Sequence, residues 1–222
     1  MDSAIIFDVD GVLLDLTPAE EDLFFLAFEQ LYGITGLSRD WDSYRIRNDE
    51  HIIAEILERH GRPRSDMTAM IETYVAIVGE RLNSGAVVPV QVSGAGQLLG
   101  ELKGSRMLGI ATANLLSAAR LRLERSGLWG PVSRLAFGAE GRGHKRETVA
   151  RAIAATGLPK DRIVYVGDNL NDVEAGLANG VHFIGFSTDP DRLRRLAAAG
   201  AQHVAGDHRQ TARLIVSLLG CG

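Results

Sequence analysis

The sequence predicts an α/β protein with a parallel, Rossmann-like sheet covered by helices on both faces and a small all-helical cap domain. Short apolar runs alternate along most of the chain with amphipathic helical segments, as in a sheet whose parallel strands are connected by helices. One long stretch, residues 16–84, contains helical patterns but no segment typical of a strand. Because this stretch directly follows the first strand, we expect a core domain of residues 1–14 and 86–222 and a cap domain of residues 15–85.

The composition is that of an ordinary globular protein. Of the 222 residues, 45% are hydrophobic and 23% are charged. The net charge of −4 does not predict a basic surface for nucleic acid. Cys221 is the only cysteine, so no intrachain disulfide or cysteine metal cluster is expected. No signal sequence or membrane-spanning apolar stretch is found, and we expect a cytoplasmic protein that does not bind membranes.

The order of the elements follows from the apolar periodicity and the helix caps. The run at 5–7 predicts a buried strand, and Thr17, Pro18 and Glu20 form a capping box that starts a helix ending at Gly33. Further helices are predicted at about 50–60, 66–83, 93–103, 115–126, 145–156, 171–179, 190–200 and 210–219, further strands at 107–111, 134–137, 163–166 and 182–186, and a glycine-rich loop at 138–143.

Polar side chains follow four strands of the predicted sheet. They are Asp8 and Asp10, then Thr112, then Lys145 beyond its loop, then Asp168 and Asp172. Because parallel strands open into one crevice at their carboxyl ends, we expect these side chains to converge there. Carboxylates of this kind suit Mg²⁺, while Lys145 and Thr112 offer an ammonium and a hydroxyl to phosphoryl oxygens. Each residue alone could be a turn, cap or surface residue, but their combination favours a chemical site.

In these motifs the chain resembles the haloacid dehalogenase superfamily, and specifically its phosphatase branch. The matching segments are Asp8-Val9-Asp10-Gly11-Val12 for the first motif, Thr112 for the second, Lys145 for the third and Gly167-Asp168 through Asp172 for the fourth. The helical insertion also matches the family's cap in position and size. Two places depart from the pattern, because Arg146 stands where many relatives have proline and Ala113-Asn114 follows the threonine.

The resemblance implies an aspartyl-phosphate mechanism. Asp8 would be the nucleophile, and Asp10 would protonate the leaving group and then activate water. The metal would be held by Asp8, the backbone carbonyl of Asp10, Asp168 and Asp172, and the phosphate by Thr112, Ala113, Asn114 and Lys145. The sequence thus predicts a Mg²⁺-dependent phosphomonoester hydrolase for a small phosphorylated metabolite such as phosphoglycolate, a sugar phosphate or a nucleotide.

Two other functions stay open at this point. A sugar-phosphate mutase of the same superfamily would use the same core and grip a second phosphate with cap arginines. Arg45 and Arg47 are the candidates for such substrate binding, together with Arg62 and Arg64, although all four could simply face solvent. A noncatalytic, receiver-like protein that binds phosphate and Mg²⁺ is the second alternative. We expect a monomer or a homodimer.

Overall fold

Six parallel strands form the centre of the protein, in the order β5-β4-β1-β6-β7-β8. They are β1 (Ala4–Phe7), β4 (Met107–Ala111), β5 (Ala136–Phe137), β6 (Ile163–Gly167), β7 (His182–Phe186) and β8 (His203–Ala205). After β1, the next strands of the sheet, β4 and β5, are added on one side of it. The chain then returns to the other side of β1 and adds β6, β7 and β8 there. This arrangement confirms the predicted parallel sheet and places β1 and β6 side by side at its centre.

The computed structural model describes residues 1–141 and 143–220. Arg142, which belongs to the predicted glycine-rich loop, and Cys221 lie outside the described residues. Within the two described stretches, no helix has both the length and the apolar character needed to cross a lipid bilayer.

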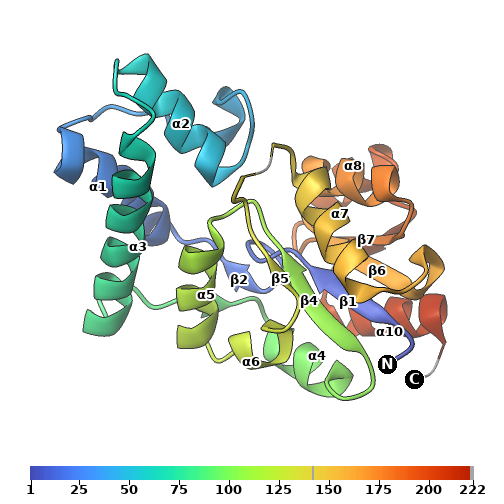
Figure 1. Ribbon diagram of the computed structural model, residues 1–222. Coiled ribbons are helices and arrows are strands. Elements are labelled where there is room, and N and C mark those ends of the chain that lie inside the picture. The colour runs from blue at the N-terminus through green and yellow to red at the C-terminus, as the bar shows by residue number, and fades with distance from the viewer. Residues whose placement is uncertain (142, 221–222) are drawn as a thin grey trace.

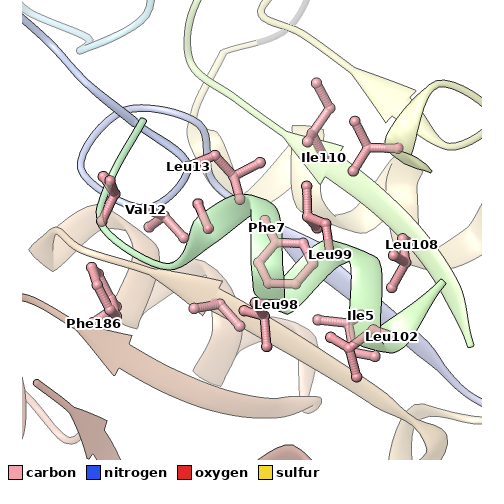
Figure 2. Close-up of a cluster of buried hydrophobic side chains, with 14 of the residues drawn as sticks. Ile5, Phe7, Val12, Leu13, Leu98, Leu99, Leu102, Leu108, Ile110 and Phe186 are labelled. Atoms are coloured by element: carbon pink, nitrogen blue, oxygen red, sulfur yellow. The ribbon is translucent and has the colours of Figure 1, made fainter. Parts of the chain in front are cut away.

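Helices cover both faces of the sheet (Figure 1). Those that follow the strands are α4 (Ala95–Leu102), α5 (Leu116–Arg125), α6 (Trp129–Val132), α7 (Lys145–Thr156), α8 (Leu170–Asn179), α9 (Pro190–Ala198) and α10 (His208–Leu219), with a 3₁₀ turn at Lys160–Arg162. Ile5 and Phe7 of β1 pack toward α4 and α10, as Figure 2 shows for the α4 side. Ala4 and Ile6 point to the other face, toward α7 and α8. This alternation is the period-two pattern of a strand buried on both sides.

Three helices form a separate group, which we call the α1–α3 lobe (Figure 1). The lobe consists of α1 (Pro18–Tyr32), α2 (Asp49–Arg59) and α3 (Asp66–Ser84), with a 3₁₀ turn at Trp41–Ser43. Phe24 lies at the centre of its apolar cluster, in edge-to-face contact with Phe28 and Tyr74. Leu115 and Ala118 of the core join the same cluster, so the lobe packs on α5. The capping box predicted at the start of α1 is confirmed.

Several short elements were not predicted. Strand β2 (Leu14–Asp15) pairs antiparallel with β3 (Val90–Gln91), and this ribbon joins the two connections between the lobe and the sheet. Strand β8 and helix α6 were also missed, and β5 is shorter than the predicted strand. Elements of two to four residues are too short to show a periodic pattern, so only their pairing in the folded protein defines them.

A histidine at the start of the C-terminal helix α10 anchors the turn after β1. The ring of His208, the first residue of α10, stacks on Phe186 with 4.3 Å between centroids. Its Nε2 lies 2.8 Å from the carbonyl oxygen of Val12, so this nitrogen carries the proton and donates it. Burial lowers the pKa of His208, and the ring is held neutral at pH 7.

We expect His208 to make the protein sensitive to mild acid. Because the folded-state pKa lies below the unfolded value of about 6.5, the unfolded chain binds more protons as the pH falls below about 6.5. The stability contributed by neutral His208 is therefore complete above that pH and is lost progressively toward the folded-state pKa. Urea unfolding of wild type and His208→Gln at pH 8 to 5 should show the wild type losing more stability; parallel curves would contradict this.

Candidate active site

The turn after β1 brings two acids to the carboxyl edge of the sheet. The backbone N–H of Asp8 still donates to the carbonyl of Val166 on β6, at 2.8 Å. Gly11 then adopts a φ of +74°, and a Cβ at this position would overlap the Asp168 carboxylate. Only glycine meets both requirements, the left-handed backbone and the close approach. The turn at Gly11 therefore packs directly against the acid that follows β6.

Three carboxylates meet at this edge of the sheet. Asp8, Asp168 and Asp172 are buried, and each offers an oxygen within 4.8 Å of the other two. Burial raises the pKa of Asp8 well above its ordinary value, and the neighbouring carboxylates add to the effect. Burial and the charge of Asp172 likewise raise the pKa of Asp168 to about 7. Crowded buried acids of this kind favour a cation among them.

Lys145 supplies one such cation from the first residue of α7. Its Nζ lies 2.7 Å from Asp8 Oδ1 and 3.2 Å from Asp172 Oδ1. Burial alone would lower the pKa of Lys145, but attraction to Asp172 and Asp8 outweighs it and raises the pKa. The ammonium is therefore charged and fixed between the acids of the first and fourth motifs.

Asp172 has protein partners on both carboxylate oxygens. Oδ1 accepts a hydrogen bond of 2.6 Å from the Tyr165 hydroxyl in addition to its contact with Lys145. Oδ2 accepts from the backbone N–H groups of Asp168 and Asn169, both at 3.1 Å. Asp172 thus holds the start of α8 and the backbone of Asp168 in place. That it also binds a metal directly stays a prediction.

The loop after β4 forms another wall of the site. Thr112 is fully buried, and its hydroxyl donates to Asn114 Oδ1 at 2.6 Å while accepting from the Asn114 N–H at 3.1 Å. Ala113 and Asn114 line a cavity in front of it. The phosphate-binding role predicted for these three residues stays a prediction, and the Thr112 hydroxyl already has a partner.

The cavity has a volume of about 390 Å³ and lies between the sheet edge and the α1–α3 lobe. Its core side includes Asp8, Asp10, Lys145 and Asp168, so the structure brings most of the predicted residues together. The residues that line it from the lobe include Leu23, Phe24, Trp41, Arg47, Asp49, Ile52, Tyr74 and Val78.

The two cap arginines predicted to bind substrate lie in different places. Arg47 lines the cavity, but its guanidinium pairs with Asp42 at 3.1 Å. Arg45 pairs with Glu55 and Glu58 on α2, and its side chain is 64% exposed. Among the described residues that line the cavity, Arg45 is absent, so the structure does not bring it to the site.

Arg122 is a site residue that the sequence interpretation missed. It is buried on α5, where its Nη2 lies 2.7 Å from Asp10 Oδ1 and its Nε donates to Glu20 Oε1 at 2.8 Å. The buried residues of α5 are Ala118, Ala119, Arg122 and Leu123, so the arginine lies on an otherwise apolar stripe. A charged residue on such a stripe needs a partner, and this signal was present in the sequence.

Asp49 and Arg192 were missed as well. Asp49 of the lobe accepts from the N–H of Leu115 at 2.9 Å, and its own N–H donates to the carbonyl of Ala113 at 2.9 Å. Burial raises the pKa of Asp49 to about 7. Arg192 on α9 pairs with Asp168 Oδ2 at 2.9 Å and donates to its carbonyl at 2.8 Å. The contacts of Asp49 and of Arg192 join segments that are distant in the sequence, so no local sequence pattern predicts them.

The donor set fits Mg²⁺. Asp8 and Asp168 are adjacent hard oxygen donors, and burial, with repulsion by the neighbouring carboxylates, raises the pKa of both. A divalent ion held by these two acids, with a few further oxygens, would relieve that repulsion.

The protein has a Rossmann-like parallel sheet with an acidic, lysine-containing cavity at the carboxyl ends of its strands. In α/β proteins of this class the ligand binds at this edge of the sheet. The model of the haloacid dehalogenase-like hydrolase family matches residues 5–186, and the chain belongs to that family. This confirms the resemblance seen in the sequence motifs.

Solved structures show the same fold at low sequence identity. CbbY from Rhodobacter sphaeroides, in complex with phosphate, has a TM-score of 0.75 and 19% identity over 94% of this chain and 95% of that one. A hydrolase from Pseudomonas syringae has a TM-score of 0.71 and 19% identity over 98% and 99%. A haloacid dehalogenase family hydrolase from Deinococcus radiodurans R1, with bound phosphate and sodium, has a TM-score of 0.61 and 21% identity over 98% and 96%. No curated protein matches the chain.

Binding of Mg²⁺ should stabilise the folded protein through Asp168. At a Mg²⁺ concentration of roughly ten times the Kd, we expect the melting temperature to rise by about 3–6 °C. Asp168→Asn should lose most of this shift, because it removes a charged oxygen donor from the cluster. Asp161→Asn, at an exposed position in the 3₁₀ turn that precedes β6, is the control of equal charge. Equal shifts in all three proteins, measured by calorimetry, would exclude the site.

Proposed function

We propose that the protein is a phosphomonoester hydrolase that acts on a small phosphorylated metabolite through an aspartyl-phosphate on Asp8. One observation carries the proposal. Asp8 and Asp10 face the same cavity, yet each has its own cation, Lys145 at 2.7 Å and Arg122 at 2.7 Å. Two acids in different surroundings suit two different roles in one reaction.

In the first step, a carboxylate oxygen of Asp8 attacks the substrate phosphorus. Its Oδ1 is held by Lys145 and by the Val9 N–H at 2.7 Å, so Oδ2 is the oxygen left for attack. The bond between phosphorus and the leaving oxygen breaks, and Asp10 transfers its proton to that oxygen. The products are an alcohol, an aspartyl-phosphate on Asp8 and an Asp10 carboxylate.

In the second step, the same residues release the phosphate. The Asp10 carboxylate takes a proton from a water molecule as that water attacks the phosphorus. The bond between phosphorus and Asp8 breaks, which frees inorganic phosphate and returns Asp8 to its carboxylate form with the proton back on Asp10. Lys145 stays charged throughout and balances the charge next to Asp8.

Mg²⁺ would be held by the carboxylates of Asp8 and Asp168 and by the carbonyl of Asp10, with Asp172 behind them. When bound, it would balance negative charge on the transferring phosphoryl group. The α1–α3 lobe would act as the cap, formed by residues 15–85, that covers the cavity. A cytoplasmic location and a monomeric or homodimeric state stay predictions.

The charges of the lobe favour a hydrolase over a mutase. Among the described cavity residues, Arg47 is the one lobe arginine, and it is already paired with Asp42. Glu20, Glu21 and Asp49 place carboxylates on the same side. A mutant of CbbY has been solved with xylulose-1,5-bisphosphate, so a protein of this fold binds a bisphosphate. In this chain a second phosphate would face carboxylates.

The purified protein should release inorganic phosphate from members of a phosphomonoester panel in the presence of Mg²⁺. Asp8→Asn should lower kcat by at least about 10³-fold, because an amide is a poor nucleophile. Asp161→Asn should be unaffected, since it is exposed and lies at the opposite edge of the sheet.

Two outcomes would count against this proposal. If the wild type converts a sugar 1-phosphate into its isomer, with a trace of bisphosphate and without phosphate release, the mutase is the correct function. If no member of the panel yields phosphate, a noncatalytic role gains support.

A further inference from the structure

A buried arginine connects the proposed acid–base residue to the lobe. Arg122 is 4% exposed and belongs to α5 of the core. Its Nη2 contacts Asp10 in the turn after β1, and its Nε contacts Glu20 in the first turn of α1. Three segments far apart in the sequence therefore meet at one charged group.

Both carboxylates are needed to keep this arginine in the interior. A buried guanidinium costs several kcal/mol in lost hydration unless well-placed carboxylates surround it. Burial would lower the pKa of Arg122, but attraction to Asp10 and Glu20 raises it, so the group is charged. An apolar side chain would pack at this position on the stripe of α5 without such a requirement. The arginine is thus better explained by what it holds than by packing.

Glu20 is fixed independently of the arginine. Its Oε2 accepts from the N–H and the hydroxyl of Thr17, at 3.1 and 2.9 Å, which completes the capping box of α1. Its Oε1 is thereby directed to Arg122 Nε. The guanidinium is held at Nε by the start of α1, so its Nη2 can orient Asp10.

The ion pair leaves one oxygen of Asp10 available. Oδ1 lies against Arg122 Nη2, and within the described residues the side chain of Asp10 has no second ion pair or hydrogen bond. Asp10 is also 22% exposed, so part of it reaches the cavity. A protonated carboxyl can keep Oδ1 against the guanidinium while Oδ2 carries the proton. Lys145, meanwhile, is held by Asp8 and Asp172.

We propose that Arg122 is a positioning residue that fixes Asp10 so that Oδ2 exchanges the proton with the leaving oxygen and with water. Arg122 itself gains and loses no proton. This inference rests on the proposed hydrolase function, and it adds a residue outside the four motifs to the reaction. The docked lobe takes part through Glu20, because the guanidinium needs both acids to stay in place.

The test compares two esters that differ in their need for an acid. The leaving group of an alkyl phosphate is a strongly basic alkoxide that needs a proton. The leaving group of p-nitrophenyl phosphate is a stable phenolate that does not. The ratio of kcat/KM for the two esters reports proton transfer in the first step. Arg122→Met should lower kcat/KM for the alkyl ester by about 10²-fold and for the nitrophenyl ester by less than about tenfold.

Further variants keep the result interpretable. Arg122→Lys retains a charge but cannot contact both acids in the same way, so it should change the ratio by about tenfold. This variant takes the place of Arg122→Met if Arg122→Met does not fold. Asp10→Asn should shift the ratio in the same direction as Arg122→Met. Arg120→Met, an exposed arginine on the same helix that pairs with Glu124, should leave both esters unchanged.

The outcomes separate this inference from the proposed function. Losses of equal size for both esters in the Arg122 variants would show a purely structural role and overturn the inference alone. A wild type that releases phosphate from no member of the panel, these two esters included, would overturn the hydrolase function, and the inference with it. A shifted ratio in Arg122→Met or Arg122→Lys, with a normal ratio in Arg120→Met, supports it.

Discussion

The ammonium of Lys145, buried between Asp8 and Asp172, is the interaction on which the rest of the site depends. The sheet brings three acids to one edge, and buried like charges repel strongly without a cation among them. A lysine in the first turn of a helix is disfavoured by the helix dipole, so its place at the start of α7 reflects the acids it pairs with. Mg²⁺ would supply the remaining charge.

A second charged group organises the other half of the cavity. Arg122 pairs with Asp10 and connects it to Glu20 of the lobe. Asp49 makes a further polar contact from the lobe, to the start of α5. The lobe is thus joined to the core by polar groups that lie at the site itself, and by apolar packing on α5. Its position and the chemistry of the core are therefore linked.

The sequence predicted those strands, helix starts and site residues that follow from a local pattern of residue types. Apolar runs that end in acids identified β1 and β6, and the capping box fixed the start of α1 at the correct residue. The four motifs predicted the core side of the cavity, which includes Asp8, Asp10, Lys145 and Asp168. Contacts between distant segments could not be predicted, because Arg192 and Asp49 have ordinary local surroundings. For the same reason, Arg45 and Arg47 looked equivalent in the sequence, although only Arg47 reaches the cavity.

The most direct test of the central claim is to trap the covalent intermediate. Wild-type protein turning over a substrate with labelled phosphate would be quenched in acid within milliseconds, digested and analysed for the labelled peptide. Attack by Asp8 predicts a transient label on Asp8, formed before phosphate release, and no label in Asp8→Asn. Rapid phosphate release with no label on the protein, or a label on another residue, would contradict the assignment of Asp8 as nucleophile.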